Sequence, residues 1–303
     1  MRLRAPVPDD APAVLAVLEA RDVADLGVSD YTLGDLLDEW RAGEFDLDAD
    51  AVVAEAEDGE IVAYASVARE GARVAVAPSH EGQGIGSQLL RWAEARERAL
   101  RRSRHRQWIA GGNTRAAALL RCAGYAPIRS YWRMARRLDG GMPAPERVPA
   151  PAGVRLRPLD PDRDAVALHA LDAASFATNP DYEPESLEQF RIGHLEAHNL
   201  DPGLSCVAEQ DGQPIGFLLA RRWEEEGVGF VDILAVHPQA QRRGLATALL
   251  TQAFAAFAAA ALGEAQLGVA SDNPRALALY ERVGMSPKFR ADIYERAIRS
   301  EHA

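Results

Sequence analysis

The fold is indicated most clearly by residues 236–246, which read Val236-His237-Pro238-Gln239-Ala240-Gln241-Arg242-Arg243-Gly244-Leu245-Ala246. This stretch leads from a strand through a compact loop into an alanine-rich helix, which runs from Ala246 to Leu262 and ends at Gly263, a natural cap. Gly244 and the small Ala246 let the backbone approach a ligand closely, and the unpaired amides at a helix start favour an anion. The stretch therefore predicts a binding site for a pyrophosphate.

Landmarks of this stretch recur in the first half of the chain. Three pairs of residues lie 160 positions apart: Val76 and Val236, Gly84 and Gly244, and Asn113 and Asn273. Between the two copies, residues 139–153 hold four prolines and three glycines, a composition that excludes a helix or the interior of a sheet. We therefore predict two duplicated domains, residues 1–138 and 154–303, joined by a linker at residues 139–153.

Both halves show the same order of short elements. Apolar runs at 51–54, 61–64 and 73–76 in the first half have counterparts at 205–208, 215–220 and 230–234 in the second. Turn residues such as Asp58-Gly59 and Asp211-Gly212 separate the runs, which favours hairpins, and helical segments lie before and after them. The expected fold class is α/β (α+β), with a mixed, mostly antiparallel sheet flanked by helices in each domain.

The pattern Gln-x-x-Gly-x-Ala after Val-x-Pro resembles the coenzyme A signature of the GNAT acetyltransferase superfamily. A second motif, from Ser271 to Met285, follows at the family spacing, and the resemblance covers both halves. The plain alternative is a strand-to-helix turn that merely needs small residues. The Val-x-Pro lead, the repetition and the second motif weigh against it. The resemblance implies two tandem GNAT domains and a site for acetyl-CoA (coenzyme A) made by Leu234, Ala235, Val236, Gln241, Arg242, Arg243, Gly244, Leu245, Ala246, Thr247 and Asn273.

Two residues of the second half are candidates for proton transfer. Tyr280 stands where the family commonly keeps a tyrosine, whose hydroxyl can protonate the departing sulfur of coenzyme A. The alternative is a buried aromatic side chain on an amphipathic helix. Asp232 lies four residues before Val236, and strand alternation places it on the same side as Leu234 and Val236, where family members often hold a carboxylate base. An ordinary aspartate at a strand edge fits that position nearly as well.

The first half lacks both proton-transfer candidates. Leu120 stands at the position of Tyr280, Ala72 at that of Asp232, and Glu81 introduces a negative charge into the glycine loop. We therefore expect this half to be catalytically degenerate. Its loop retains the residues for a second coenzyme A site, which would consist of Val76, Gly82, Gln83, Gly84, Gly86, Ser87 and Asn113. Both Asn113 and Asn273 have the alternative role of capping a helix.

The function implied by the resemblance is an acetyl-CoA dependent N-acetyltransferase that acts on a small amine by direct transfer. One competent copy in a duplicated chain is similar to the mycothiol synthase family, which acetylates the cysteinyl amine of a sugar-linked thiol precursor. Two alternatives remain: an acyltransferase for another acyl-CoA or acceptor atom, and a non-catalytic acyl-CoA sensor or scaffold. We expect the acceptor pocket to lie at residues 176–200 and near Trp223. His194 and His198 are helically spaced, but no third ligand is evident, so no metal is expected.

Composition limits the partners and the compartment. The formal net charge is −11, which argues against nucleic acid and anionic membranes. The chain holds two cysteines, Cys122 and Cys206, and no apolar stretch long enough to span a bilayer. The N-terminus lacks the apolar core of a signal peptide. We expect a cytoplasmic protein, either a monomer, as an intramolecular pseudo-dimer, or a homodimer.

Overall fold

The computed structural model describes residues 1–29, 31–69, 71–139, 147–179 and 182–298. The chain forms two compact units. Unit 1 comprises Met1–Trp132, Ala270–Asp272 and Phe289–Ala303, and unit 2 comprises Arg133–Val269 and Asn273–Lys288. Each unit has its own set of strands and helices, as the duplication in the sequence predicts.

Unit 1 is built on six strands in the order β1-β2-β3-β4-β5-β12. All neighbours are antiparallel except β4 and β5, which are parallel. Its strands are β1 (Arg2–Arg4), β2 (Ala51–Glu55), β3 (Ile61–Ala68), β4 (Gly71–Val76), β5 (Arg104–Ala110) and β12 (Ser286–Ala297). Its helices are α1 (Ala11–Leu26), α2 (Leu33–Arg41), α3 (Leu47–Asp50), α4 (Ile85–Ala99) and α5 (Thr114–Cys122).

Unit 2 repeats this plan in the order β6-β11-β10-β9-β8-β7. Strands β7 to β10 are antiparallel neighbours, and β10 and β11 are parallel. Its strands are β6 (Ala126–Arg137, of which 133–137 belong to unit 2), β7 (Arg155–Pro158), β8 (Cys206–Gln210), β9 (Gln213–Trp223), β10 (Val228–Val236) and β11 (Glu264–Ala270). Its helices are α6 (Pro161–Phe176), α7 (Leu187–Phe190), the π-helical turn Arg191–Leu195, α8 (Leu245–Ala259) and α9 (Pro274–Arg282). The mixed, mostly antiparallel sheets confirm the predicted fold class.

Alternating strand residues build two apolar layers in each unit. In unit 1, Val53 packs with the residues of α1 and α2, whereas Val52 and Ala54 pack with α4. In unit 2, Phe217 and Leu219 of β9 pack under α6 and α7. Since successive strand residues point to opposite faces, the intervening side chains of β9 meet α8, which packs against the same strand. Each sheet is thereby covered by helices.

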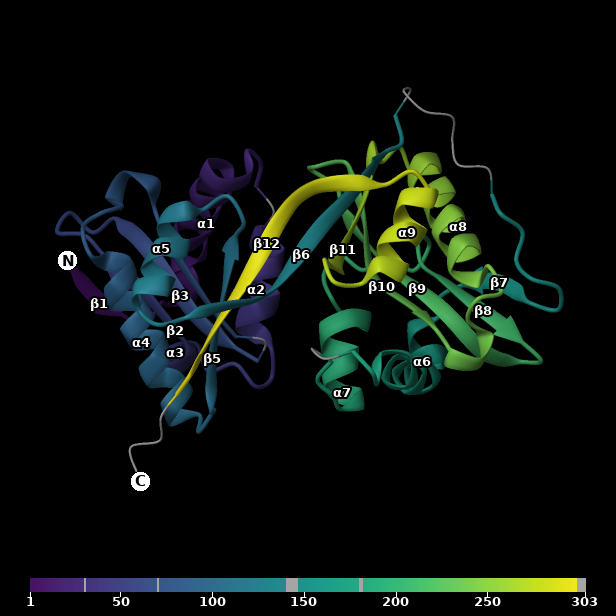
Figure 1. Cartoon of the computed structure of the whole chain (residues 1–303), viewed down its shortest axis with the longest axis horizontal. Coiled ribbons are helices and arrows are strands. Elements are labelled where there is room, and N and C mark those ends of the chain that lie inside the picture. Colours follow the sequence, from purple (N-terminus) through teal and green to yellow (C-terminus); the bar gives the residue numbers. More distant parts are fainter. Residues whose placement is uncertain (30, 70, 140–146, 180–181, 299–303) are drawn as a thin grey trace. The chain divides into compact units, whose positions relative to one another are not determined.

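The compact units differ from the contiguous boundaries 1–138 and 154–303 because the final strands of the two repeats are exchanged. Strand β12, drawn in yellow in Figure 1, pairs antiparallel with β5 of unit 1, from Ala291 opposite Ala110 to Ala297 opposite Arg104. The end of β6 belongs to unit 2 in turn. Residues 140–146 of the predicted linker lie outside the described residues, and its remaining residues, 139 and 147–153, form neither helix nor strand.

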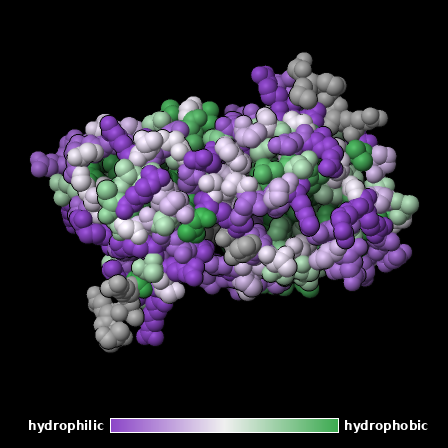
Figure 2. Space-filling model, viewed as in Figure 1, coloured by the Kyte–Doolittle hydropathy of each residue, from purple (hydrophilic) through white to green (hydrophobic). Residues whose placement is uncertain are grey.

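The face drawn in Figure 2 is dominated by hydrophilic residues, and its hydrophobic residues form small separate groups. Among the helices of the described residues, none combines the length and the apolar character that crossing a membrane requires.

Candidate functional site

The glycine loop of unit 2 leads into helix α8 and leaves the space at Gly244, just before the helix, open. Gly244 has φ +85° and Arg242 has φ +61°, so the loop turns through the left-handed region just before α8. A Cβ added at Gly244 would meet no atom within 4 Å. No side chain caps the helix at Gly244, so within the described residues the first amides of α8, at Leu245, Ala246 and Thr247, have no capping partner from that position. This geometry suits an anion at the positive end of the helix dipole.

Side chains around this loop fix its conformation. The Gln241 Nε2 donates to the carbonyl oxygen of Val236 at 3.1 Å, which ties the loop to the end of β10. An exposed hydrogen bond of 3.2 Å links Arg243 Nη1 to Gln210 Oε1. A role of Arg242 and Arg243 in binding phosphate stays a prediction.

Strand β10 separates from β11 on its way to this loop. The parallel pairing covers Val228 to Val231 of β10 only. On its other side, β10 continues to pair with β9 as far as Val236, with a β-bulge between Val231 and Ile233. Among the described residues, the β11-facing edge of Leu234, Ala235 and Val236 therefore carries no ladder partner. Such an edge can form hydrogen bonds with an extended arm that contains amides. The pantetheine of coenzyme A is an arm of this kind.

Tyr280 lies on α9 and is nearly buried, with 9% of its surface exposed. Burial raises the pKa of its hydroxyl to about 12, so the group keeps its proton at neutral pH and can act as a donor. Asn273 caps the same helix, since its Oδ1 accepts from the Ala276 amide at 3.1 Å. The capping role is therefore observed, and contact of Asn273 with the cofactor stays a prediction.

The β-bulge corrects the expected direction of Asp232. Strand alternation predicts that Asp232 shares a side with Leu234 and Val236, but the bulge inserts an extra residue and breaks the alternation at this point. The carboxylate instead contacts Arg221 of β9 and His194 of the π-helical turn, with His194 Nδ1 at 2.8 Å and Arg221 Nη2 at 3.1 Å. Asp232 thus faces the layer of α6.

These contacts change what Asp232 can do. Burial alone would raise the pKa of its carboxyl, but Arg221 and His194 outweigh that effect and hold the pKa well below its usual range. A carboxylate stabilised so strongly is a weak proton acceptor. The geometry favours Asp232 as a residue that orients its neighbours, and its role as the base has no support from these contacts.

His194 is the second member of this cluster. Burial lowers the pKa of the imidazole, yet Asp232 and Glu185 raise it to about 10, so His194 is cationic at neutral pH. Its Nε2 lies 3.6 Å from Glu185 Oε2. The sequence marks His194 only through its helical spacing from His198. Among the described residues, no group of three or more histidines, cysteines and carboxylates could hold a metal ion.

The ion pairs of His194 should make stability depend on pH. The folded pKa of about 10 lies above the ordinary value of 6.5, so the stabilisation is complete below about pH 6.5 and is lost as pH rises through 10. We expect the melting temperature of His194→Gln to lie clearly below that of the wild type at pH 6.5, and the difference between the two melting temperatures to be smaller at pH 10. Thermal denaturation of both proteins at both pH values measures this difference. His80→Gln, which removes only an exposed contact with Ser79, is the control. A gap that does not change with pH would contradict the assignment.

Asp172 is a further buried carboxyl group that sequence reasoning missed. It lies on α6 with 9% of its surface exposed, and burial raises its pKa to about 6, against a hydrogen bond from Tyr182 and the charge of His194. An aspartate within a helical stretch carries no distinguishing signal in the sequence. Only the packing of α6 against β9, β10 and the π-helical turn brings it to the cluster.

The loop of unit 1 has the same backbone but different charges. Gly82 and Gly84 have φ +75° and +81°, matching Arg242 and Gly244. The Glu81 carboxylate is held between Arg21 and Arg115, which lower its pKa against the effect of burial. The predicted second site consists of Val76, Gly82, Gln83, Gly84, Gly86, Ser87 and Asn113, and it stays a prediction.

Two further contacts distinguish the copy in unit 1. Asn113 caps α5 by accepting from the Ala116 amide at 2.8 Å, and its Nδ2 donates to Asp25 at 2.8 Å, so both ends of its amide are engaged. Leu120 is buried, 4% exposed, on α5, the helix that corresponds to α9. The side chain that stands in place of Tyr280 is thus part of the core.

Models of known protein families match both halves of the chain. The family model described as "Acetyltransferase (GNAT) family" matches residues 166–285, and the one described as "Acetyltransferase (GNAT) domain" matches residues 48–127. A protein of Beutenbergia cavernae named mycothiol acetyltransferase is 33% identical over 238 residues, which cover 76% of this chain and 77% of the relative.

Solved structures show the same fold over nearly the whole chain. A GCN5-related N-acetyltransferase from Sphaerobacter thermophilus has a TM-score of 0.78 at 29% identity, covering 98% of this chain and 96% of that one. A tandem GNAT protein from the clavulanic acid biosynthesis pathway also reaches 0.78, at 18% identity, over 98% of this chain and 99% of that one. At 18% identity the likeness concerns the fold alone.

Proposed function

Because the chain belongs to the GNAT acetyltransferase family, we propose that unit 2 transfers the acetyl group of acetyl-CoA to the amine of a small acceptor. The observation that carries this proposal is the uncapped start of α8 after Gly244, next to the edge of β10 that β11 does not pair. A diphosphate at the helix start and an extended arm along β10 would use both features at once.

The residues of unit 2 fit coenzyme A in their chemistry. The amides of Leu245, Ala246 and Thr247 would bind the diphosphate, and the backbone of Leu234 to Val236 would bind the pantetheine arm. Strand β10 rises by about 3.3 Å per residue, so an arm that starts near Val236 reaches the level of Asp232 after about 13 Å. The reacting end would therefore lie close to the bulge.

Acetyl-CoA supplies an activated acetyl thioester when it is bound. Tyr280 holds a proton that it can give to the departing sulfur, because its pKa of about 12 lies well above neutral pH. Asp232 and His194 fix each other and shape the acceptor side of the site. The layers of apolar side chains around β9 and β10 limit the access of water.

The acceptor is proposed as a small primary amine derived from a thiol compound, because the name mycothiol acetyltransferase belongs to the relatives that cover most of this chain. Release of free thiol from acetyl-CoA, measured across aminoglycosides, polyamines, amino sugars, peptide N-termini and cysteinyl amino sugars, tests the proposal. We expect amine-dependent release with a cysteinyl amino sugar. If calorimetry shows that the protein binds coenzyme A but no amine is acetylated, the transferase proposal is wrong. The alternative of a non-catalytic acyl-CoA sensor then takes its place.

A further inference from the structure

A ring of polar contacts in unit 1 ties its glycine loop to two helices. The Glu81 carboxylate of the loop accepts hydrogen bonds from Arg21 of α1 and from Arg115 at the start of α5. Arg21 also donates to Asp25 of α1 at 2.6 Å. Asp25 in turn accepts from the side-chain amide of Asn113, the cap of α5, at 2.8 Å. The contacts therefore run from the start of α5 through α1 and the loop back to the start of α5.

This ring engages the cationic groups beside the loop. Arg21, whose side chain is 16% exposed, is shared between the carboxylates of Glu81 and Asp25. The bond from Arg115 contributes less, because 77% of that side chain is exposed. Burial alone would raise the pKa of the Glu81 carboxyl, but both arginines lower it, so the group is charged at neutral pH. An incoming phosphate would meet this fixed negative charge and two cations that already have a partner.

The corresponding loop of unit 2 has no carboxylate at this position. Gln241 stands in place of Glu81, and its neutral amide donates to the carbonyl oxygen of Val236 at 3.1 Å. The backbones of the two loops agree, because Gly84 and Gly244 have φ +81° and +85° and no side chain caps either helix there. The two loops therefore differ in their fit to an anion through their side chains.

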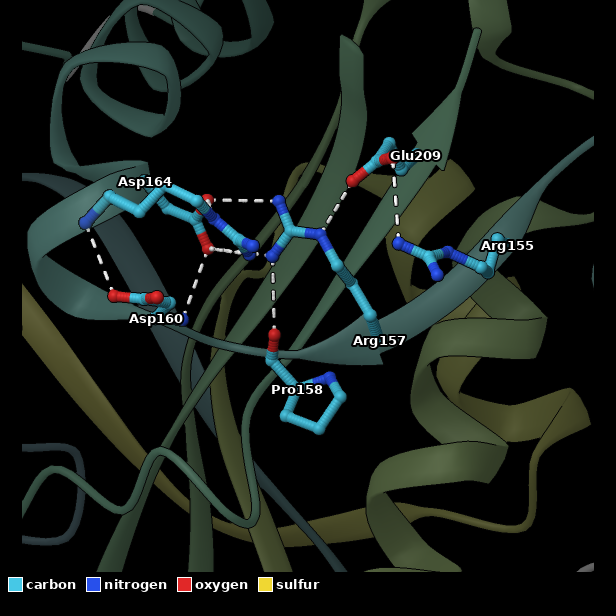
Figure 3. A network of polar contacts seen from close by, with 7 residues as sticks. Arg155, Arg157, Pro158, Asp160, Asp164 and Glu209 are labelled. Carbon is cyan, nitrogen blue, oxygen red and sulfur yellow. Dashed lines mark hydrogen bonds and ion pairs between the residues drawn. The ribbon is translucent and has the colours of Figure 1, made fainter. Parts of the chain in front are cut away.

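A second network shows which ion pairs the two copies share. Arg157 of β7 donates to both carboxylate oxygens of Asp164, at 2.7 and 2.9 Å (Figure 3). Arg4 of β1 donates in the same way to Asp10, at 2.5 and 3.0 Å. In each unit this pair ties the first strand to the start of the helix that follows. A network found in both copies serves their common fold, whereas the ring around Glu81 accompanies a change in one glycine loop.

We propose that Glu81 is an internal anion that keeps the glycine loop of unit 1 closed to the diphosphate of coenzyme A. Its carboxylate holds the two arginines that could otherwise bind phosphate, and its charge repels a second anion. Unit 1 then keeps the backbone of an anion site without holding the cofactor. The second site predicted from the sequence is latent, and a neutral side chain at position 81 would open it. This inference concerns unit 1 and stands apart from the proposed transfer in unit 2.

Glu81→Gln tests the closure by giving unit 1 the side chain that unit 2 has in Gln241. Isothermal titration calorimetry with coenzyme A counts the sites. We expect one equivalent for the wild type and two for Glu81→Gln. Removal of the like charge and release of two guanidinium groups should tighten binding at this loop by about 10- to 100-fold. Two equivalents in the wild type, or no additional equivalent in Glu81→Gln, would overturn the proposal.

The same substitution in the Gly244→Val background separates the two units. Gly244→Val alone should bind no coenzyme A, and the double variant with Glu81→Gln should bind one equivalent. A full equivalent retained by Gly244→Val alone would show that unit 1 is open and would overturn the closure. If the wild type binds none but Glu81→Gln binds one, the closure is supported and the proposed function of unit 2 fails.

Asp10→Asn is the control, because it removes a carboxylate of unit 1 from the network that both copies share. It should keep the one equivalent of the wild type. An additional equivalent in Asp10→Asn would show that general loosening of unit 1 admits the ligand, which would overturn the assignment to Glu81. Melting temperatures establish that each variant is folded. If Glu81→Gln does not fold, the site counts of the wild type and Gly244→Val still decide, since coenzyme A bound by unit 1 contradicts its closure.

Discussion

Tyr280→Phe should lower kcat by about 100- to 10,000-fold, the range that a general acid contributes, while the Kd for coenzyme A stays within about twofold. The substitution removes one hydroxyl from a side chain that is 9% exposed and leaves the ring in place. Without a positioned proton, coenzyme A must then depart as a free thiolate, which is a weaker leaving group than the thiol. Thiol release under saturating acetyl-CoA measures kcat, and calorimetry measures the Kd.

Tyr294→Phe is the control, because Tyr294 is a buried tyrosine of β12 in unit 1 with no part in the proposed chemistry. It should retain the wild-type kcat. Equal losses in both variants would indicate a general packing effect. Full activity of Tyr280→Phe would exclude Tyr280 as the acid and return it to the alternative role of a buried aromatic side chain.

Gly244→Val should abolish productive binding of acetyl-CoA, with a loss of about 100-fold or more in kcat/KM for this substrate, since each charge-assisted hydrogen bond to a phosphate contributes about 1.5–3 kcal/mol. Two effects act together. A β-branched residue is strained at φ +85°, and its side chain would fill the open space in front of the helix start. Steady-state kinetics with acetyl-CoA as the varied substrate measures the loss.

The duplicated chain provides a matched control for this variant in Gly84→Val. Gly84 has φ +81° and likewise meets no atom within 4 Å, so the backbone strain of the two variants is similar. We expect Gly84→Val to lower the melting temperature about as much as Gly244→Val and to leave turnover intact. Loss of turnover in Gly84→Val would show that the loop of unit 1 contributes to catalysis. Calorimetric stoichiometry in each variant would show which loop holds coenzyme A.

The local features of both loops follow from the sequence. Gly244 and Gly84 adopt the left-handed conformation that glycine tolerates, and the helices begin at the next residue. The apolar runs around Asp58-Gly59 and Asp211-Gly212 form the predicted strands. These features depend on residues close together in the chain, so patterns over ten or fifteen positions suffice to predict them.

Such patterns could not predict the cluster of ionisable side chains around Asp232. Asp172, Glu185, His194, Arg221 and Asp232 span sixty positions, and each is an ordinary polar residue in its own segment. Alternation also gave the wrong direction for Asp232, because a bulge depends on how β10 pairs with β9. The shifted pKa values of Asp172 and His194 arise from burial and from the charges and hydrogen bonds gathered there.

The sequence by itself determined the duplication, the family, the two glycine loops before α4 and α8 and the leucine that stands in place of Tyr280 in the first copy, because short-range backbone preferences and residue identity carry that information. Tertiary structure alone decided the exchange of β12 into unit 1, the bulge at Asp232 and the burial that raises the pKa of Asp172. These depend on strand pairing and on the packing of distant segments. Electrostatic energies depend on distances and on access of water, and both are set only when the chain has folded.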